Sequence, residues 1–287
     1  MDVLVVFLGA IDTSDYASMV LSIPNIPPMS VLTLFFLGLI RIAPIVSLAP
    51  FLGSKLPGSV KIGLAIALTA VLLPHIIFTA KMPPPTYDLT FLIYSLKEFL
   101  IGMIIAFLAT IPFYIAQSSG VLIDFLRGSS ALQVTDPFMQ TQTSPIGILY
   151  NYVFVVLFYQ IDGPFFFLNG VYQSYNLIPA DAFINTAFFS LQQPFWKITT
   201  SLLTQFISLA MQLAAPSLVA ILMGEMFLGI ANRLAPQVQF AFLGIALKSL
   251  LAIALLWAGW FFILEQLGKQ SLLWLQQMDR ILQSIPK

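Results

Sequence analysis

Charged side chains interrupt or border stretches of this chain that are otherwise strongly apolar. A carboxylate in such a place can carry a proton or form an ion pair, and a basic side chain can neutralise it. A charge at mid-depth in a lipid bilayer costs at least about 2.5–3.5 kcal/mol. We therefore expect each of these groups to have a partner or to line water; they are Arg41, Lys97, Glu98, Glu225, Arg233 and Lys248.

Glu225 would be the most costly of these groups if it faced lipid, and it has two interpretations. It is either a proton carrier of a transporter or half of a structural ion pair that locks helices or subunits together, which we favour. Arg233 and Lys248 are the first candidates for its partner. Lys97 and Glu98 are adjacent, so they should point in different directions from a helix and make poor partners for each other.

Signatures of catalysis are mostly missing. The chain has no cysteine, which excludes disulfides, thiolate catalysis, iron–sulfur clusters and cysteine-ligated zinc. The single histidine, His75, follows Pro74 near the end of an apolar stretch, where a capping or interfacial role fits it best. No glycine-rich phosphate loop follows a strand pattern. We predict that the chain is not an enzyme and that it has no catalytic, cofactor or metal site.

Composition defines the class of protein. Of 287 residues, 59% are hydrophobic and only 8% are charged, and the mean hydropathy is +0.94. Soluble proteins usually carry about 25% charged residues, so lipid or neighbouring subunits must cover much of this surface. The net charge is zero and no basic run exists, which argues against nucleic-acid binding.

The apolar stretches predict an all-α, multi-helix integral membrane protein built of helical hairpins, with residues 1–287 as a single membrane-embedded unit. A spanning helix needs about 20 mainly apolar residues, and six stretches reach that length. They are Met29–Leu52, Val60–Phe78, Phe91–Ala116, Ile146–Leu168, Leu202–Ile230 and Phe240–Leu264.

Prolines and small residues inside these stretches predict helices that pack against protein. Proline kinks are expected at positions such as Pro44, Pro112 and Pro216, and each frees a backbone carbonyl that needs another partner. Small residues four apart, as in Gly63/Ala67 and Gly102/Ala106, permit close approach of helices.

Two proline-bearing corners predict tight helical hairpins. Pro57 marks the first corner, which precedes Lys61, a further candidate for an assembly contact or an ion pair. Pro236 and Gln237 mark the second, which follows Arg233. The Pro-Gln dipeptide is also typical of PQ-loop transporters, but those carry it twice and a second copy is absent.

Three further segments lie outside the predicted spans. Residues 1–28 begin with acidic rather than basic residues, so we expect a short interfacial helix and no cleavable signal. Residues 265–287 are predicted to form an amphipathic C-terminal tail.

Residues 117–144 form a loop rich in Gln, Ser and Thr, and uncharged polar groups suit the wall of an aqueous conduit. This loop is either a gating element, with Gln133, Gln140 and Gln142 as gate candidates, or an ordinary connection.

The ordered motifs of this chain resemble the SctT/FliR family. Each motif alone is weak, but their order and spacing are fairly specific from about Met29 to the end of the sixth stretch. They are Arg41-Ile-Ala-Pro44, Ala49-Pro50-Phe51-Leu52-Gly53, Val60-Lys61-Ile62-Gly63, Glu98-Phe-Leu-Ile-Gly102, Pro112-Phe-Tyr-Ile-Ala-Gln117-Ser-Ser-Gly120, Ser144-Pro145, Met211-Gln212-Leu-Ala-Ala-Pro216 and Phe227 to Gln239 with Lys248.

This resemblance implies subunit T of the export apparatus of a type III secretion system, in the bacterial inner membrane. In that family the subunit joins R-type and S-type subunits in a helical export gate, and a U-type subunit packs at the entrance. Unfolded polypeptides would pass through the shared pore. The motif Pro112–Gly120 and the pair Ala215-Pro216 are closer to injectisome members than to flagellar ones. Helices of this family can be raised out of the bilayer plane.

The competing function, from a different class, is proton-coupled secondary transport of a small solute. In that case Glu225 would be the coupling acid.

Overall fold

The computed structural model describes residues 27–53, 56–80, 89–128, 144–183, 194–234 and 240–283. Within these ranges every regular element is a helix, as the apolar stretches predict. The chain divides into two compact units. Unit 1 comprises Met1–Ala109, Leu168–Gln193 and Leu282–Lys287, and unit 2 comprises Thr110–Phe167 and Pro194–Ile281.

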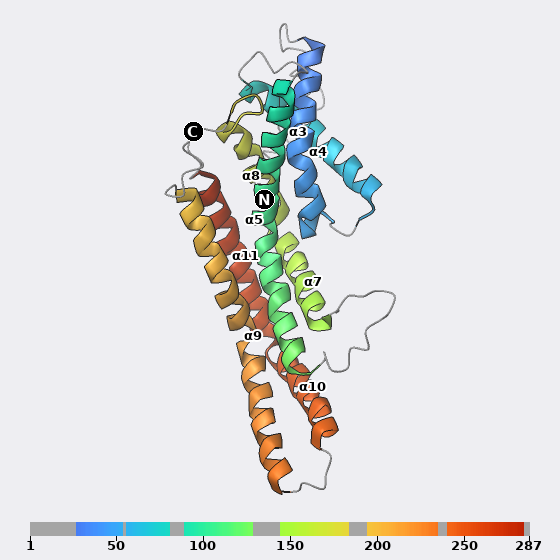
Figure 1. Ribbon diagram of the computed structural model, residues 1–287, viewed down its shortest axis with the longest axis vertical. Coiled ribbons are helices and arrows are strands. Elements are labelled where there is room, and N and C mark those ends of the chain that lie inside the picture. Colours follow the sequence, from blue (N-terminus) through green and yellow to red (C-terminus); the bar gives the residue numbers. More distant parts are fainter. Residues whose placement is uncertain are drawn as a thin grey trace. The chain divides into compact units, whose positions relative to one another are not determined.

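Unit 1 begins with a helical hairpin. Helix α3 (Pro28–Leu48) and the short 3₁₀ helix η1 (Pro50–Leu52) lead to α4 (Gly58–Thr79), which packs beside α3 (Figure 1). Gly53 follows η1 with φ of 86°, a left-handed conformation that glycine adopts without steric cost. Pro57, the predicted corner residue, occupies the N-cap position of α4.

Helix α5 (Leu89–Leu126) contributes its first part to unit 1 and its last part to unit 2. It runs ten residues past Ala116, where the apolar stretch ends, because the polar side chains that follow find partners within the fold. Ser119 Oγ donates to the carbonyl of Ala116 at 2.7 Å, and Gln117 Oε1 accepts a hydrogen bond from Asn151 at 3.3 Å. The expected start of the polar loop at residue 117 was therefore wrong. Residues 129–143, with the gate candidates Gln133, Gln140 and Gln142, lie outside the described residues.

The fourth apolar stretch, expected as one helix over Ile146–Leu168, is broken. Helix α7 (Pro145–Gln160) and helix α8 (Gly163–Leu177) meet at a bend of 75°. Asp162 lies at the break with φ of 56°, and aspartate is one of the few non-glycine residues that adopt this conformation readily.

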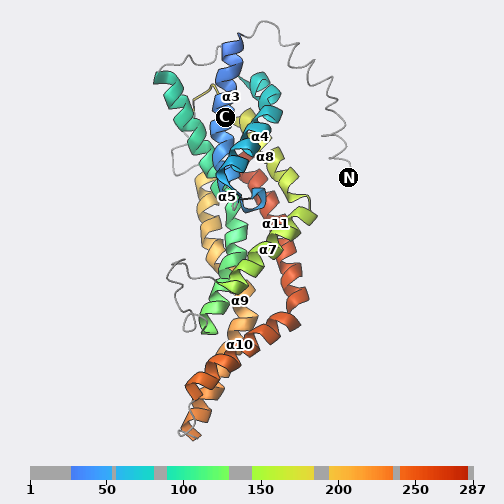
Figure 2. The ribbon, with the colours of Figure 1, turned by 90° about the vertical axis from the view of Figure 1, so that its right-hand side faces the viewer.

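The rest of unit 2 is a long hairpin of two helices, α9 (Pro194–Leu234) and α10 (Phe240–Ala258), followed by a third helix, α11 (Trp260–Gln283), that is bent away from α10. Helix α9 packs against α10, and the bend between α10 and α11 at Gly259 is visible in Figure 2. The predicted sixth stretch, Phe240–Leu264, is therefore broken, and the two helices meet at a bend of 66°. The predicted corner residues Pro236 and Gln237, and the N-terminal residues 1–26, lie outside the described residues.

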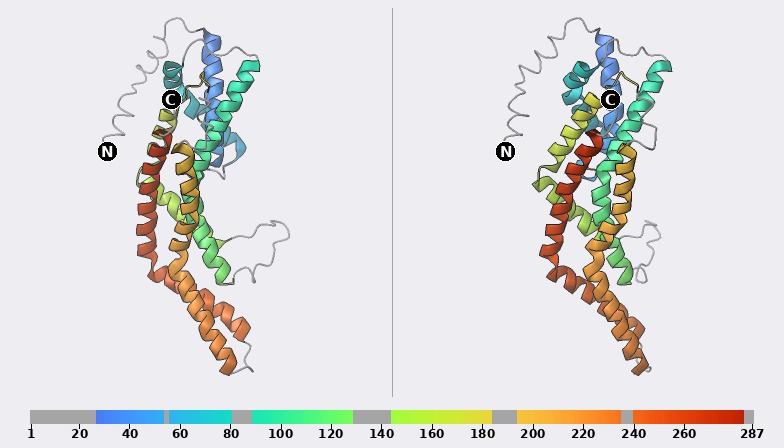
Figure 3. Two further views of the ribbon diagram at one scale, coloured as in Figure 1. Left: turned by 60° about the vertical axis from the view of Figure 1, so that its left-hand side comes forward. Right: turned by 90° about the vertical axis from the view of Figure 1, so that its left-hand side faces the viewer.

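Helix α11 covers residues 265–283 of the segment expected as an amphipathic C-terminal tail. Its buried side chains recur every three to four residues, at Ile263, Leu267, Ser271 and Trp274, which is the spacing of one face of a helix. Figure 3 shows α11 running alongside the first half of α9.

Among the described residues, four helices are long and apolar enough to cross a membrane, and there are up to six such spans if each bent pair counts as one. The protein is thus a multi-pass helical membrane protein. Two helices exceed a single crossing: α5 has 38 residues and α9 has 41. At a rise of about 1.5 Å per residue they measure roughly 57 and 62 Å, against a hydrocarbon core of about 30 Å.

Candidate functional site

The centre of unit 1 is an ion pair between α3 and α5. Arg41 Nε lies 2.5 Å from Glu98 Oε2, and Arg41 Nη2 donates to Glu98 Oε1 at 2.8 Å. Both side chains are completely buried. A bidentate pair of this kind fixes orientation as well as charge, so these two predicted candidates lock the two helices to each other.

Arg41 also reaches α8 and the residue after it. Its Nη1 donates to Ser174 Oγ at 3.2 Å, its Nη2 donates to the carbonyl of Ile178 at 2.8 Å, and the guanidinium carbon lies 4.0 Å from the centre of the Tyr175 ring. A single buried side chain therefore joins three helices that are distant in sequence.

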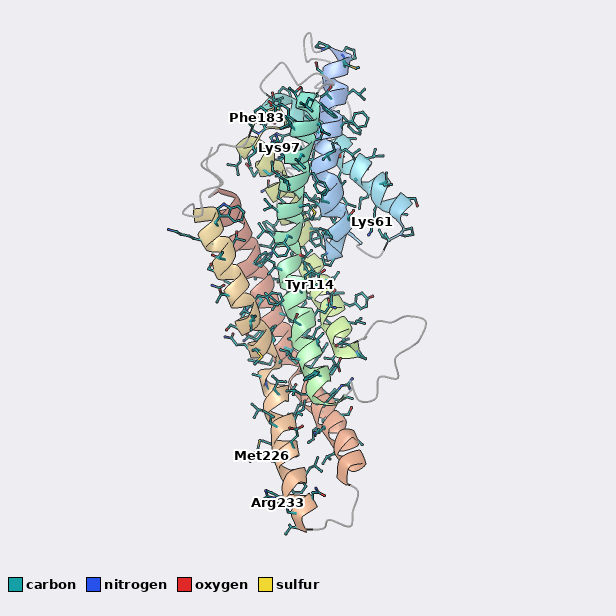
Figure 4. The ribbon with its side chains drawn as sticks, in the orientation of Figure 1. Lys61, Lys97, Tyr114, Phe183, Met226 and Arg233 are labelled. Atoms are coloured by element: carbon teal, nitrogen blue, oxygen red, sulfur yellow. The ribbon has the colours of Figure 1, made fainter. Side chains whose placement is uncertain are left out.

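Lys97 completes the cluster and corrects one expectation. Its ammonium lies 2.7 Å from Glu98 Oε1 and donates to the carbonyls of Pro179, Ala180 and Ala182 at 2.8–2.9 Å. The prediction that Lys97 and Glu98 are poor partners was wrong, because a long flexible lysine stem lets its ammonium turn back to the neighbouring carboxylate. Figure 4 shows Lys97 in the region of the chain that also contains Phe183.

Gly102 is the reason that α3 and α5 approach so closely. A Cβ at this position would meet the backbone carbonyl of Arg41. Gly102 lies four residues after Glu98, on the same face of α5, so the missing side chain lets the carboxylate one turn earlier reach the guanidinium. By contrast, a Cβ at Gly63 would meet nothing within 4 Å.

A second ion pair closes the hairpin of unit 2. Lys248 Nζ on α10 lies 2.5 Å from Glu225 Oε1 on α9. The side chains are 21% and 42% exposed, respectively, in the chain by itself. Of the two candidate partners, the structure thus brings Lys248 to Glu225. Arg233 lies two turns further along α9, exposed in its last turn (Figure 4).

A third polar cluster, which the sequence analysis missed, ties the ends of α5 and α7 together. Asp124 Oδ2 accepts hydrogen bonds from Ser144 Oγ at 2.5 Å and from the backbone N–H of Ile146 at 2.9 Å. Arg127 lies 2.6 Å from the other oxygen of Asp124 and donates to Ser249 Oγ on α10 at 3.2 Å. Ser144-Pro145 is a recognisable start of a helix, but nothing in the sequence pairs it with Asp124.

Two further predicted residues, Lys61 and His75, each contact a neighbouring helix of unit 1. Lys61, in the first turn of α4, donates to the carbonyl of Ser47 at 3.5 Å. His75 Nε2 lies 3.1 Å from the carbonyl oxygen of Tyr172, and the two rings stack at 3.5 Å. Among the described residues, no group of three acidic or histidine side chains is arranged to hold a metal ion.

Unit 2 contains a cavity of about 170 Å³ between α5, α7, α9 and α11. Its walls are aliphatic and aromatic apart from Gln205, Gln270 and Gln277, and no charged side chain lines it. The cavity therefore offers neither a general acid nor a general base.

Comparison with known proteins defines the family. Residues 32–272 match the family described as bacterial export proteins, family 1. The chain therefore belongs to this family of bacterial export proteins, as the resemblance to SctT/FliR predicts.

Relatives come from both secretion and flagellar systems. The chain is 28% identical to the Yop proteins translocation protein T of Yersinia pestis, over 72% of this chain and 78% of that protein. It is 29% identical to the secretion system apparatus protein SsaT of Salmonella typhimurium, over 67% of this chain and 72% of that protein. It is 28% identical to the flagellar biosynthetic protein FliR of Bacillus subtilis, over 75% of this chain and 81% of that protein. The protein is thus a membrane component of a secretion apparatus.

Proposed function

We propose that this chain is the T-type subunit of a type III export gate in the bacterial inner membrane. It would join R-type and S-type subunits, with a U-type subunit at the entrance, and help form the pore through which unfolded polypeptides pass. The family match over residues 32–272 supports this function. The proposal is for a structural, pore-forming role, with no reaction catalysed by the chain.

The observation that carries the proposal is the surface of the α9–α10 hairpin. On α9, Met226, Phe227 and Ile230 are 72%, 66% and 60% exposed, and Trp257 on α10 is 84% exposed. An ion pair lies on the same hairpin, between α9 and α10. Lipid would cover the apolar side chains but not the charges, whereas neighbouring subunits with polar groups would accommodate both.

The lengths of α5 and α9 also favour surroundings made of neighbouring subunits rather than of lipid alone. Both helices are roughly twice as long as the hydrocarbon core is thick, and each contains an internal proline, Pro112 or Pro216. Helices of this length suit an assembly that raises part of the subunit out of the bilayer.

Within this class we favour an injectisome over a flagellar system. The preference rests on the motif Pro112–Gly120 and on Ala215-Pro216. The relatives alone do not separate the two classes, because the identities to Yop translocation protein T and to the Bacillus FliR are equal.

We also propose that the Gln/Ser/Thr-rich segment closes the pore, with Gln133, Gln140 and Gln142 as gate residues. Its uncharged polar character would let it close without burying a charge. Asp124 supports this idea because it holds together the helix ends on either side of the segment, α5 and the start of α7 at Ser144.

The competing transporter function assigns proton coupling to Glu225. Its contact with Lys248 supports a structural ion pair instead, since the two charged groups lie 2.5 Å apart and join α9 to α10.

Co-expression tests the proposal. Alone, the chain should be poorly folded, because the exposed apolar side chains beside the ion pair of the α9–α10 hairpin would lack neighbouring subunits. Co-expression with the R-type subunit should raise its yield and its resistance to protease. A monodisperse, protease-resistant monomer that takes up a small solute with protons would support the transporter and contradict the export gate.

A further inference from the structure

The corner after α8 is a turn whose carbonyl oxygens converge on one point. Helix α8 ends at Leu177, and the backbone N–H of Ala182 donates to the carbonyl of Pro179 at 3.2 Å, which closes the turn. The last carbonyls of a helix have no partner within it, and a glycine in the left-handed conformation often caps them. No glycine occupies residues 178–183.

Lys97 binds the carbonyls of the corner that follows the helix, in an unusual set of contacts. Its ammonium lies 2.7–2.9 Å from four oxygens: the carbonyls of Pro179, Ala180 and Ala182, and Glu98 Oε1. Its side chain is 6% exposed, and Ala180 is completely buried. An ammonium has three N–H donors, so each of the three carbonyls can take one.

These distances fit a particular class of ion. Calcium binds oxygen at about 2.3–2.6 Å and magnesium at about 2.0–2.1 Å, so a cage at 2.7–2.9 Å is too wide for either. Backbone carbonyls arranged in this way can replace the hydration shell of a potassium ion. An ammonium group presents its charge as a compact point, in the same way as such an ion.

The charges around the corner also fit one positive charge at this point. Arg41 and Lys97 are cationic, and Glu98 contacts both of them. Asp181 is buried on the same corner. With Lys97 present, two positive and two negative groups balance; without it, the cluster lacks one positive charge, which a monovalent cation would restore.

We propose that the corner of residues 178–182, together with Glu98, is a monovalent-cation site whose native cation is the ammonium of Lys97. Lys97 is therefore a positioning residue that holds the corner onto α5. When the lysine side chain is removed, the same four oxygens should accept a free ion of the size of ammonium or potassium. This inference concerns the internal architecture of unit 1 and does not depend on the proposed export function.

The test uses the full chain in detergent-solubilised native membranes, in chloride salts of equal ionic strength. Lys97→Ala removes the ammonium and leaves the cage open. Its thermal midpoint should fall in choline or lithium chloride and recover most of the loss in potassium or ammonium chloride. Lys97→Met fills the space with an uncharged side chain, so it should be destabilised in every salt alike. Lys269→Ala, at an exposed pair with Glu265, is the control and should be stable in every salt.

Two results would overturn the proposal. One is a Lys97→Ala variant as stable as the wild type; the other is an equal recovery in all salts, including choline. If the Lys97→Ala variant does not accumulate, the Lys97→Arg variant tests whether the cage is specific for a compact cation. A guanidinium keeps the charge but is planar and larger than the compact ammonium, so it should lower the midpoint, and a midpoint equal to that of the wild type would contradict a cage built for a compact cation.

Discussion

Arg41 and Glu98, 57 residues apart in sequence, form a bidentate ion pair that is completely closed off from solvent. Glu98 also contacts Lys97, so a single carboxylate is in contact with two buried cations. Removing one partner of a buried pair is strongly destabilising, because the remaining charge stays uncompensated.

The first prediction follows from this arrangement. Glu98→Gln should destabilise the chain by about 3–5 kcal/mol, because Arg41 and Lys97 would then lack their shared counter-charge. The same change at Glu265, whose pair with Lys269 is about half exposed, should cost less than about 1 kcal/mol. Thermal midpoints and protease resistance of the solubilised protein measure both. Equal effects of the two changes would show that the cluster does not hold unit 1 together.

The close approach of α3 and α5 gives a second prediction. Gly102→Ala would place a methyl group against the backbone of Arg41, and overpacking of this kind costs about 1–3 kcal/mol. Gly63→Ala is the matched control, since its Cβ would enter open space within α4 and alanine favours a helix by about 0.5–1 kcal/mol over glycine. The two variants should therefore shift the thermal midpoint in opposite directions. A stable Gly102→Ala variant would contradict the helix packing described above.

The third prediction concerns the hairpin of unit 2. Glu225→Gln should weaken assembly with partner subunits, because Lys248 loses its counter-charge. The charge swap Glu225→Lys with Lys248→Glu should restore part of the assembly, measured as the yield of co-purified subunits. Glu225→Lys with Arg233→Glu is the control and should restore none of it. Intact assembly of Glu225→Gln together with a lost proton-dependent activity would favour the transporter.

The fourth prediction tests the gate. Deleting part of residues 133–143 should leave assembly intact, because the Asp124 contacts to Ser144 and Ile146 lie outside the deletion. The membrane should then leak small ions, as a conductance measurement would detect. A bulky charged residue in place of Gln140 or Gln142 should instead slow export. A shortened variant that is ion-tight and secretes normally would show that the segment is an ordinary connection and not a gate.

Hydropathy was enough to predict the class of fold and the approximate places of the helices. It did not predict their breaks and ends, because those depend on local geometry and packing. Asp162-Gly163 is a turn signal that the apolar stretch around it concealed. The extension of α5 past Ala116 depends on contacts with α7, such as that between Gln117 and Asn151, and these are not visible in the sequence of α5 alone.

The candidate site could be predicted as a set of residues but not as a set of contacts. The cost of burying charge identified Arg41, Glu98, Glu225 and Lys248, and each of them has a charged partner. The carbonyls that surround Lys97 could not have been predicted, since every residue has a carbonyl and only the fold decides which of them converge.

Co-purification tests the central proposal most directly. The tagged chain would be isolated from membranes that also contain homologous R-type and S-type subunits, with a tagged unrelated multi-pass protein as the control. The export-gate function predicts that both subunits are recovered with the chain in fixed proportion and withstand salt washing, and that the control recovers neither. Recovery of the chain alone, folded and monodisperse, would contradict it.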